Sequence, residues 1–168
     1  FIRPEYQRKY ASLSLIWQGI GQFIARNPEY QNLYGCVSLT ADYAPISRDL
    51  MVQFLKLKYW DEDLSRLVEA KKSPRIGTLA QNLHAHLEDS NCSVEDVSAV
   101  VSSIEEDDKG IPVLLRHYLK LNGTLLDFHL DTNFNNTTVG LILVRLVDVE
   151  PAFLRKFFGA DAAERISG

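Results

Sequence analysis

The spacing of apolar residues predicts a helix followed by a strand near the start of the chain. Between residues 11 and 27 apolar side chains recur every three or four positions, which is typical of a helix with one buried side. Asn27-Pro28 ends this helix, because a proline disfavours the helical conformation in the residue before it. The apolar run 33–40 then indicates a buried strand. We therefore expect a βαβ unit in which this strand is parallel to one that precedes Arg3.

The last third of the chain repeats this alternation of helices and strands. Pro112 suits the first turn of a helix that Gly123 closes. Strands are predicted at about 125–130 and 138–147, and the second is apolar along nearly its whole length, as in a central strand. A short amphipathic helix at 152–158 completes the predicted fold.

The middle of the chain, at about 47–110, is more polar and is predicted to be a helical insertion. Ser47 is expected to cap its first helix, with Ile46 and Met51 in contact as a hydrophobic staple. Two later helices are expected at 78–88 and after the capping-box pair Ser93 and Asp96.

These elements predict an α/β (α+β) fold in a single domain that spans residues 1–168. We expect a mixed sheet with flanking helices. Phe1-Ile2 looks like the tail of a strand, so the N-terminal strands of the sheet are expected to be missing from this chain.

The composition of the chain argues against several classes of function. The net charge of −4 gives no overall attraction to nucleic acid, and no apolar run reaches the roughly 20 residues that a membrane span needs. The acidic run 105–108 is expected to be a solvated helix end rather than an ion site. The histidines and cysteines show no metal-ligand spacing, so no metal is expected. We expect Cys36 and Cys92 to be free thiols, with Cys36 buried in the core.

Residues 3–12 form the most informative segment, because a strand end, a polar turn and a helix start follow one another. Amide N–H groups at a helix start have no partners within the helix, and the helix dipole adds partial positive charge. Such a start can bind a phosphate, although the segment also fits an ordinary capped helix with solvated basic side chains. The candidate phosphate-binding residues are Arg3, Gln7, Arg8, Lys9, Tyr10, Ala11 and Ser12.

This segment resembles a motif of the GNAT superfamily of acyltransferases. The motif lies between the fourth strand and the third helix of that fold, and its amides hold the pyrophosphate of coenzyme A or the phosphate of a carrier protein's phosphopantetheine. Pro4, Tyr6 and Gln7 match the motif. Ser12 stands at its second small position, whereas Tyr10 replaces the usual glycine. Because glycine allows close backbone approach, Tyr10 favours the single phosphate of a carrier protein over a nucleotide pyrophosphate.

Other segments are similar to the same superfamily. Residues 118–123 resemble the helix end that precedes the sixth GNAT strand. The resemblance covers most of residues 1–58 and 110–158, and residues 60–108 diverge from it. Residues 33–38, 111–121 and 131–134 are similar to segments of one branch of the superfamily, the ornithine–acyl-carrier-protein N-acyltransferases. Some members of this branch are labelled hemolysins, but nothing in this sequence points to pore formation.

The resemblance implies an N-acyltransferase that uses an acyl thioester of acyl carrier protein or coenzyme A. The pantetheine arm would lie between two splayed strands, and an amine would attack the thioester directly. A backbone N–H would stabilise the oxyanion, a contribution of roughly 3 kcal/mol. Tyr118 is the candidate acid for the leaving thiolate, although its pattern also fits a packed aromatic residue. Asp131 and His129 are candidates for the base, and Asp131 could instead bind the amine or start a loop.

The acceptor implied by the resemblance is an amino acid or a similar small amine. Residues 47–60 could line a tunnel for a long acyl chain. Two other interpretations stay open: transfer of acetyl groups from acetyl-CoA, and a GNAT-like binding module without turnover. The resemblance implies a bacterial cytoplasmic protein that could also bind peripherally to a membrane.

Overall fold

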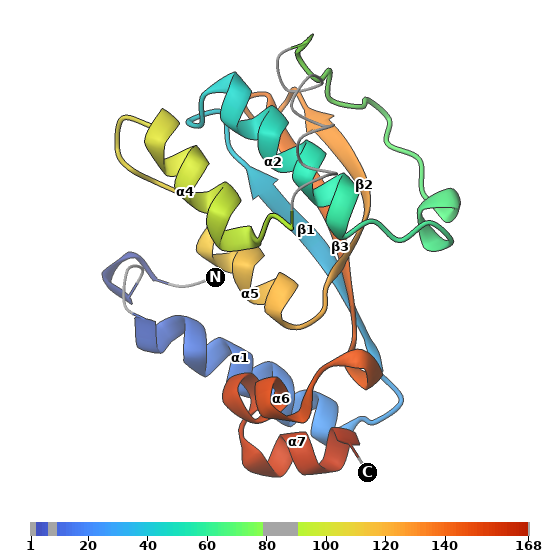
Figure 1. Ribbon diagram of the computed structural model, residues 1–168. Coiled ribbons are helices and arrows are strands. Elements are labelled where there is room, and N and C mark those ends of the chain that lie inside the picture. The colour runs from blue at the N-terminus through green and yellow to red at the C-terminus, as the bar shows by residue number, and fades with distance from the viewer. Residues whose placement is uncertain (1–2, 7–9, 79–90, 168) are drawn as a thin grey trace. The chain divides into compact units, whose positions relative to one another are not determined.

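The computed structural model describes residues 3–6, 10–78 and 91–167 of the chain. These residues form a mixed α/β structure of helices and a three-stranded sheet (Figure 1). The chain divides into two compact units, which are described in turn. The first comprises Phe1–Leu33 and Val144–Gly168, and the second comprises Tyr34–Leu143.

The first unit is built on a helix packed against two others. α1 (Tyr10–Arg26) contacts α6 (Pro151–Phe158) and α7 (Ala160–Ser167). Trp17 of α1 is buried, and its ring centroid lies 5.7 Å from that of Phe157 and 5.9 Å from that of Phe158. The short 3-10 helices η1 (Pro4–Tyr6) and η3 (Leu146–Asp148) also belong to this unit.

The predictions of α1 and α6 are confirmed, whereas α7 was not predicted. α6 and α7 are separated by Gly159, whose φ of 89° lies in the region that favours glycine. Gly159 therefore allows the chain to turn and begin a second helix after Phe158.

The sheet contains β1 (Asn32–Leu39), β2 (Thr124–Asp131) and β3 (Thr137–Arg145) in the order β1-β3-β2. β2 and β3 form an antiparallel hairpin, and all three strands make an antiparallel sheet. β3 is central, as its nearly continuous apolar sequence predicted. The parallel partner predicted for β1 would precede Arg3, so the expected mixed sheet falls partly outside the described residues.

Helices cover one face of this sheet (Figure 1). They are α2 (Pro45–Lys58), α4 (Val94–Ile104) and α5 (Val113–Lys120). Alternate strand residues point to this face, because successive side chains of a strand lie on opposite sides. The shared core contains Val37, Leu39, Met51, Phe54, Leu55, Val97, Val101, Leu115, Phe128 and Ile142. α2 and α4 therefore supply much of the core, although they lie in the region predicted to be an insertion.

The predicted start of α4 is confirmed, but that of α2 is wrong. Ser93 and Asp96 form the expected capping box at α4. At α2 the N-cap is Ala44 and Pro45 follows it, while Ser47 is buried within the first turn. The predicted hydrophobic staple of Ile46 and Met51 required Ser47 as the N-cap, so that prediction is also wrong. Residues 59–77 hold only the short 3-10 helix η2 (Leu64–Leu67), and the helix predicted at 78–88 lies almost entirely outside the described residues.

α5 ends at a turn formed by Asn122 and Gly123, as the sequence predicted. Asn122 has a φ of 57°, and the Gly123 N–H donates to the Tyr118 carbonyl at 2.9 Å. A Cβ at Gly123 would lie 2.7 Å from that carbonyl oxygen, which is too close for any other residue. The chain passes directly from this turn into β2.

Two glycines of α1 give a matched test of the packing in the first unit. A Cβ at Gly21 would lie 2.3 Å from the Phe158 Cβ, so Gly21→Ala should lower the free energy of unfolding by about 1–3 kcal/mol. Gly19 is exposed with nothing near its Cβ position, so Gly19→Ala should raise that free energy by about 1 kcal/mol through better helix propensity. Urea unfolding measures both, and equal effects of the two variants would contradict the packing of α1 on α6.

Candidate functional site

The predicted phosphate-binding segment is described only in part. Gln7, Arg8 and Lys9 lie outside the described residues, as does the side chain of Tyr10, the first residue of α1. Arg3 is exposed and lies 3.9 Å from Glu5. Ala11 is exposed, and the Ser12 hydroxyl donates to the Tyr6 carbonyl at 2.9 Å. The Ser12 side chain is therefore used to join η1 to α1.

Tyr118, the predicted acid, lies near the end of α5 and packs against the core of the second unit. It is half-buried, and this burial raises the pKa of its phenol above 10.0. The side chain is thus protonated at neutral pH, but a higher pKa also makes it a weaker proton donor.

Asp131, the first candidate for the base, begins the turn between β2 and β3. Its Oδ1 accepts the N–H groups of Asn133 and Phe134 at 3.0 and 3.1 Å. This is the pattern of an aspartate that stabilises a turn, one of the alternatives left open by the sequence. Tyr118 precedes β2 and Asp131 ends it, so an extended strand of roughly 20 Å separates them. The structure does not bring these two residues together.

His129, the second candidate for the base, is engaged by the backbone. Its Nδ1 accepts a hydrogen bond from the Lys72 N–H at 3.2 Å. The Nδ1 lone pair of His129 is therefore already engaged by a backbone donor.

Cys36 is exposed, so the prediction that it lies in the core is wrong. The alternation of β1 sends Val37 and Leu39 into the core and Cys36 to the opposite face. There it lines a shallow pocket of about 370 Å³ together with His129, Asp127, Val139 and Leu141. Because β3 separates β1 from β2, the backbones carrying Cys36 and His129 are roughly 10 Å apart. Cys36 and Cys92 are both free thiols, as predicted.

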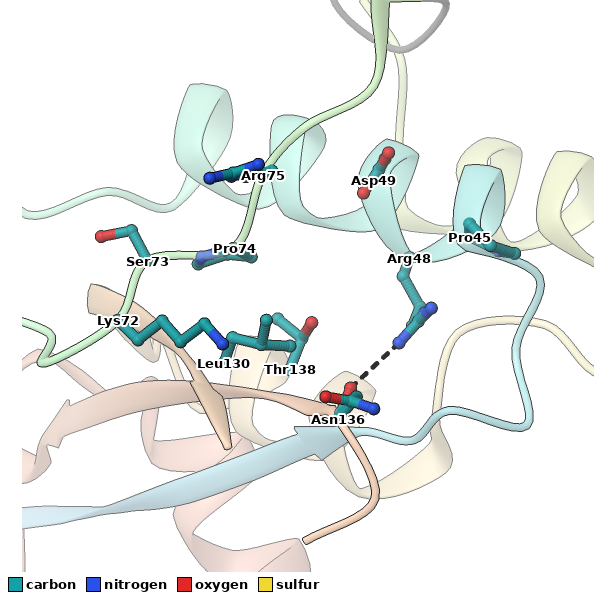
Figure 2. Close-up of a pocket in the computed structure, with 10 residues that line it drawn as sticks. All are labelled: Pro45, Arg48, Asp49, Lys72, Ser73, Pro74, Arg75, Leu130, Asn136 and Thr138. Carbon is teal, nitrogen blue, oxygen red and sulfur yellow. Dashed lines mark hydrogen bonds between the residues drawn. The ribbon is translucent and has the colours of Figure 1, made fainter. Parts of the chain in front are cut away.

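A larger cleft, of about 700 Å³, lies on the second unit beside the β2–β3 turn. One wall is the first half of α2, and the other is the extended segment 72–75. Figure 2 shows the Lys72 side chain extending toward Leu130 and into the cleft. The lining residues are Pro45, Arg48, Asp49, Lys72, Ser73, Pro74, Arg75, Leu130, Asn136 and Thr138.

Arg48 and Asp49 of α2 form hydrogen bonds to the β2–β3 turn and to the end of the extended segment. The Arg48 guanidinium donates from one terminal nitrogen to the Asn136 carbonyl at 3.1 Å (Figure 2). Its Nε is buried and makes no hydrogen bond within the described part of the chain. Asp49 accepts the Gly77 N–H at 2.8 Å, which fixes the end of the extended segment to α2.

Comparisons of the chain with protein-family models, curated proteins and solved structures find no significant match. Among the residues that the structure describes, no three His, Cys, Asp or Glu side chains are grouped so as to hold a metal ion. None of the described helices is long and apolar enough to cross a membrane.

The cleft is not predicted from the sequence, because its lining residues are far apart along the chain. Arg48 and Asn136 belong to no local motif in the sequence. The only local signal was the density of positive charge at Lys71, Lys72 and Arg75.

A buried carboxylate holds the start of α2, which carries one wall of the cleft. Glu105 is only 8% exposed and accepts the Ala44 N–H at 2.9 Å. Lys109 lies 3.5 Å from the Glu105 carboxylate and donates to the Asp42 carbonyl at 3.0 Å. A negative charge at a helix N-terminus is also favoured by the helix dipole. Glu105 was expected to be solvated, and its burial corrects that prediction; Glu106, Asp107 and Asp108 are exposed.

The contacts of Glu105 govern its protonation. Burial alone would raise the pKa of Glu105, but four effects outweigh it and lower the pKa below its ordinary 4.5. They are the approach of the Ser47 hydroxyl, the hydrogen bond from the Ala44 amide, and the charge and the hydrogen bond of Lys109. A lowered pKa in the folded state means that the ionised carboxylate stabilises the fold at neutral pH. This stabilisation is lost as the pH falls below 4.5 through the folded-state pKa.

Removal of Glu105 should therefore destabilise the second unit. Glu105→Ala should lower the free energy of unfolding at pH 7 by about 2–3 kcal/mol, because the part-buried Ala44 N–H and Lys109 lose a charged partner. Glu106→Ala is the matched control, since Glu106 is exposed, and it should change that free energy by less than about 0.5 kcal/mol. Urea unfolding from pH 7 downwards should show the difference between wild type and Glu105→Ala shrinking below pH 4.5. A constant difference would contradict the role of the ionised carboxylate.

Proposed function

We propose that this chain is a GNAT-type N-acyltransferase, which moves an acyl group from an acyl thioester to the amine of an amino acid or similar small acceptor. The order of its elements supports the proposal. The resemblance assigns α1 to the third helix of the superfamily and β2 to its sixth strand, so one strand, the fifth, must lie between them. The described residues between α1 and β2 contain one strand, β1.

The position of β1 also suits a thioester donor. β1 lies at the edge of the described sheet, next to β3. An edge strand presents N–H and C=O groups that can pair with an extended partner. In the proposed enzyme this partner is the pantetheine arm of acyl carrier protein or coenzyme A. The resemblance, and not the placement of the two units, assigns the donor's phosphate to residues 3–12.

The proposed reaction is a direct transfer without an acyl-enzyme intermediate. The amine nitrogen attacks the thioester carbonyl and forms the new C–N bond. The C–S bond then breaks, the thiolate takes a proton from an acid, and the nitrogen loses one to a base. Tyr118 is the proposed acid. Asp131 and His129 stay the proposed candidates for the base; the Asp131 carboxylate accepts two N–H groups of the β2–β3 turn, and the His129 Nδ1 accepts the Lys72 N–H.

A non-catalytic binding module is the second candidate function. It is favoured by the separation of Tyr118 from Asp131 and by the backbone hydrogen bond to His129 Nδ1. The two functions are distinguished by incubating the chain with acyl-carrier-protein thioesters, acyl-CoA or acetyl-CoA and a panel of amino acids, and by following thiol release. Acetyl transfer would identify acetyl-CoA as the donor. Donor binding without thiol release would favour the binding module.

Charge reversal at the start of α1 tests the donor site. Arg8→Glu combined with Lys9→Glu should weaken binding of acyl carrier protein or coenzyme A by about tenfold or more at low salt, because two cations near the phosphate become anions. The matched control is Arg155→Glu with Lys156→Glu, an adjacent basic pair that is exposed on α6. Calorimetric titration measures both. Unchanged donor affinity in the first variant would argue against the phosphate site.

The role of Tyr118 is tested by removal of its hydroxyl. Tyr118→Phe should slow acyl transfer by about a hundredfold while donor affinity is unchanged, because only proton donation to the thiolate is lost. Tyr59→Phe is the control: Tyr59 is also half-buried against the core, and burial raises its phenol pKa as well. Single-turnover kinetics give the rates, and equal rates for wild type and Tyr118→Phe would remove Tyr118 from the mechanism.

A further inference from the structure

The cleft beside the β2–β3 turn gathers positive charge from two separate parts of the second unit. Arg48 enters it from α2, while Lys72 and Arg75 come from the extended segment. Among the described residues that line it, these three cations face one carboxylate, Asp49, which already accepts the Gly77 N–H. A cleft lined by one sign of charge concentrates counter-ions of the opposite sign. The lining thus favours an anionic ligand with more than one negative charge.

The geometry of Arg48 indicates where the anion would bind. One terminal nitrogen of its guanidinium is held by the Asn136 carbonyl, while its buried Nε has no hydrogen-bond partner in the described structure. This Nε is covered by protein atoms, so an anion in the cleft would meet the terminal nitrogens of the guanidinium instead. Figure 2 shows Lys72 reaching into the cleft from the opposite wall. An anion in the cleft would therefore lie beside the positive charges of both Arg48 and Lys72.

The remaining lining suits a small organic molecule rather than a bare ion alone. Pro45, Pro74 and Leu130 give the cleft apolar surface next to its charges. Its volume of about 700 Å³ falls in the range of small-molecule sites.

We propose that this cleft binds the phosphate group of a small phosphate monoester, between Arg48 and Lys72 with Arg75 at its rim. A phosphate monoester carries about −1.5 to −2 charges at pH 7, which matches the excess of two cations better than a single carboxylate does. Guanidinium and ammonium groups are also the side chains that bind phosphate most strongly. This site is distinct from the donor-phosphate site of residues 3–12, and it does not depend on acyl transfer.

The experiment compares neighbouring lysines whose side chains line different pockets. Lys72 lines the cleft, whereas Lys71 lines the shallow pocket with Cys36 and His129. The contacts of Lys72 to His129 and Leu130 are made by its backbone, so Lys72→Gln keeps them. The probes are glycerol 3-phosphate, inorganic phosphate and acetate, titrated calorimetrically at low salt, with thermal unfolding of each variant as the control for folding.

Glycerol 3-phosphate should bind the wild-type protein, and Lys72→Gln should weaken that binding by about tenfold through the loss of one charged hydrogen bond. Arg75→Gln should weaken it less, and Lys71→Gln should leave it unchanged. Inorganic phosphate as tight as the ester would identify free phosphate as the source, and a tighter ester would show that the apolar wall contributes. The proposal is overturned if acetate binds as tightly as phosphate, if Lys71→Gln weakens binding as much as Lys72→Gln, or if neither phosphate binds.

Discussion

Burial of one face of the three-stranded sheet under α2, α4 and α5 is the constraint on which the second unit depends. β3 lies between β1 and β2, so its alternate residues must meet both neighbours and the helices at once. Ile142 of β3, Phe128 of β2 and Phe54 of α2 are almost fully buried at this contact. Apolar burial of this kind is the main favourable term in folding. It sets the position of α2, and through α2 it sets the wall of the cleft that carries Arg48 and Asp49.

Polar contacts then fix where α2 begins. The Ala44 N–H has no side-chain cap from its own segment, and Glu105 supplies the acceptor from the loop after α4. A buried carboxylate is tolerated here because it has both a hydrogen bond and a cation nearby. The Lys109 ammonium also lies 4.7 Å from the Tyr43 ring centroid, and the Tyr43 hydroxyl donates to the Gly110 carbonyl. This network joins α4 to the first turn of α2, beside the basic cleft.

The functional proposals depend on different observations. Acyl transfer is supported by the resemblance of the α1 and α5 segments and by the single strand between α1 and β2. The phosphate-binding cleft is supported by charge and position alone: Arg48, Lys72 and Arg75 line it with a single carboxylate, Asp49, and with the apolar surface of Pro45, Pro74 and Leu130. A result that contradicts one proposal leaves the other unaffected, because the cleft shares no residue with the segment proposed to hold the acyl donor.

The sequence by itself determined the elements whose causes are local. The apolar period of α1, the capping box of Ser93 and Asp96, and the turn at Gly123 all depend on residues a few positions apart, so their patterns are visible in the chain. The tertiary structure alone decided which of these elements meet. It buried Glu105 against a helix start far away in sequence, exposed Cys36 on the outer sheet face, and used Asp131 in a turn remote from Tyr118. It also brought Arg48, Lys72 and Asn136 to one cleft, because the packing of α2 on the sheet, which no local pattern encodes, places α2 across the cleft from segment 72–75.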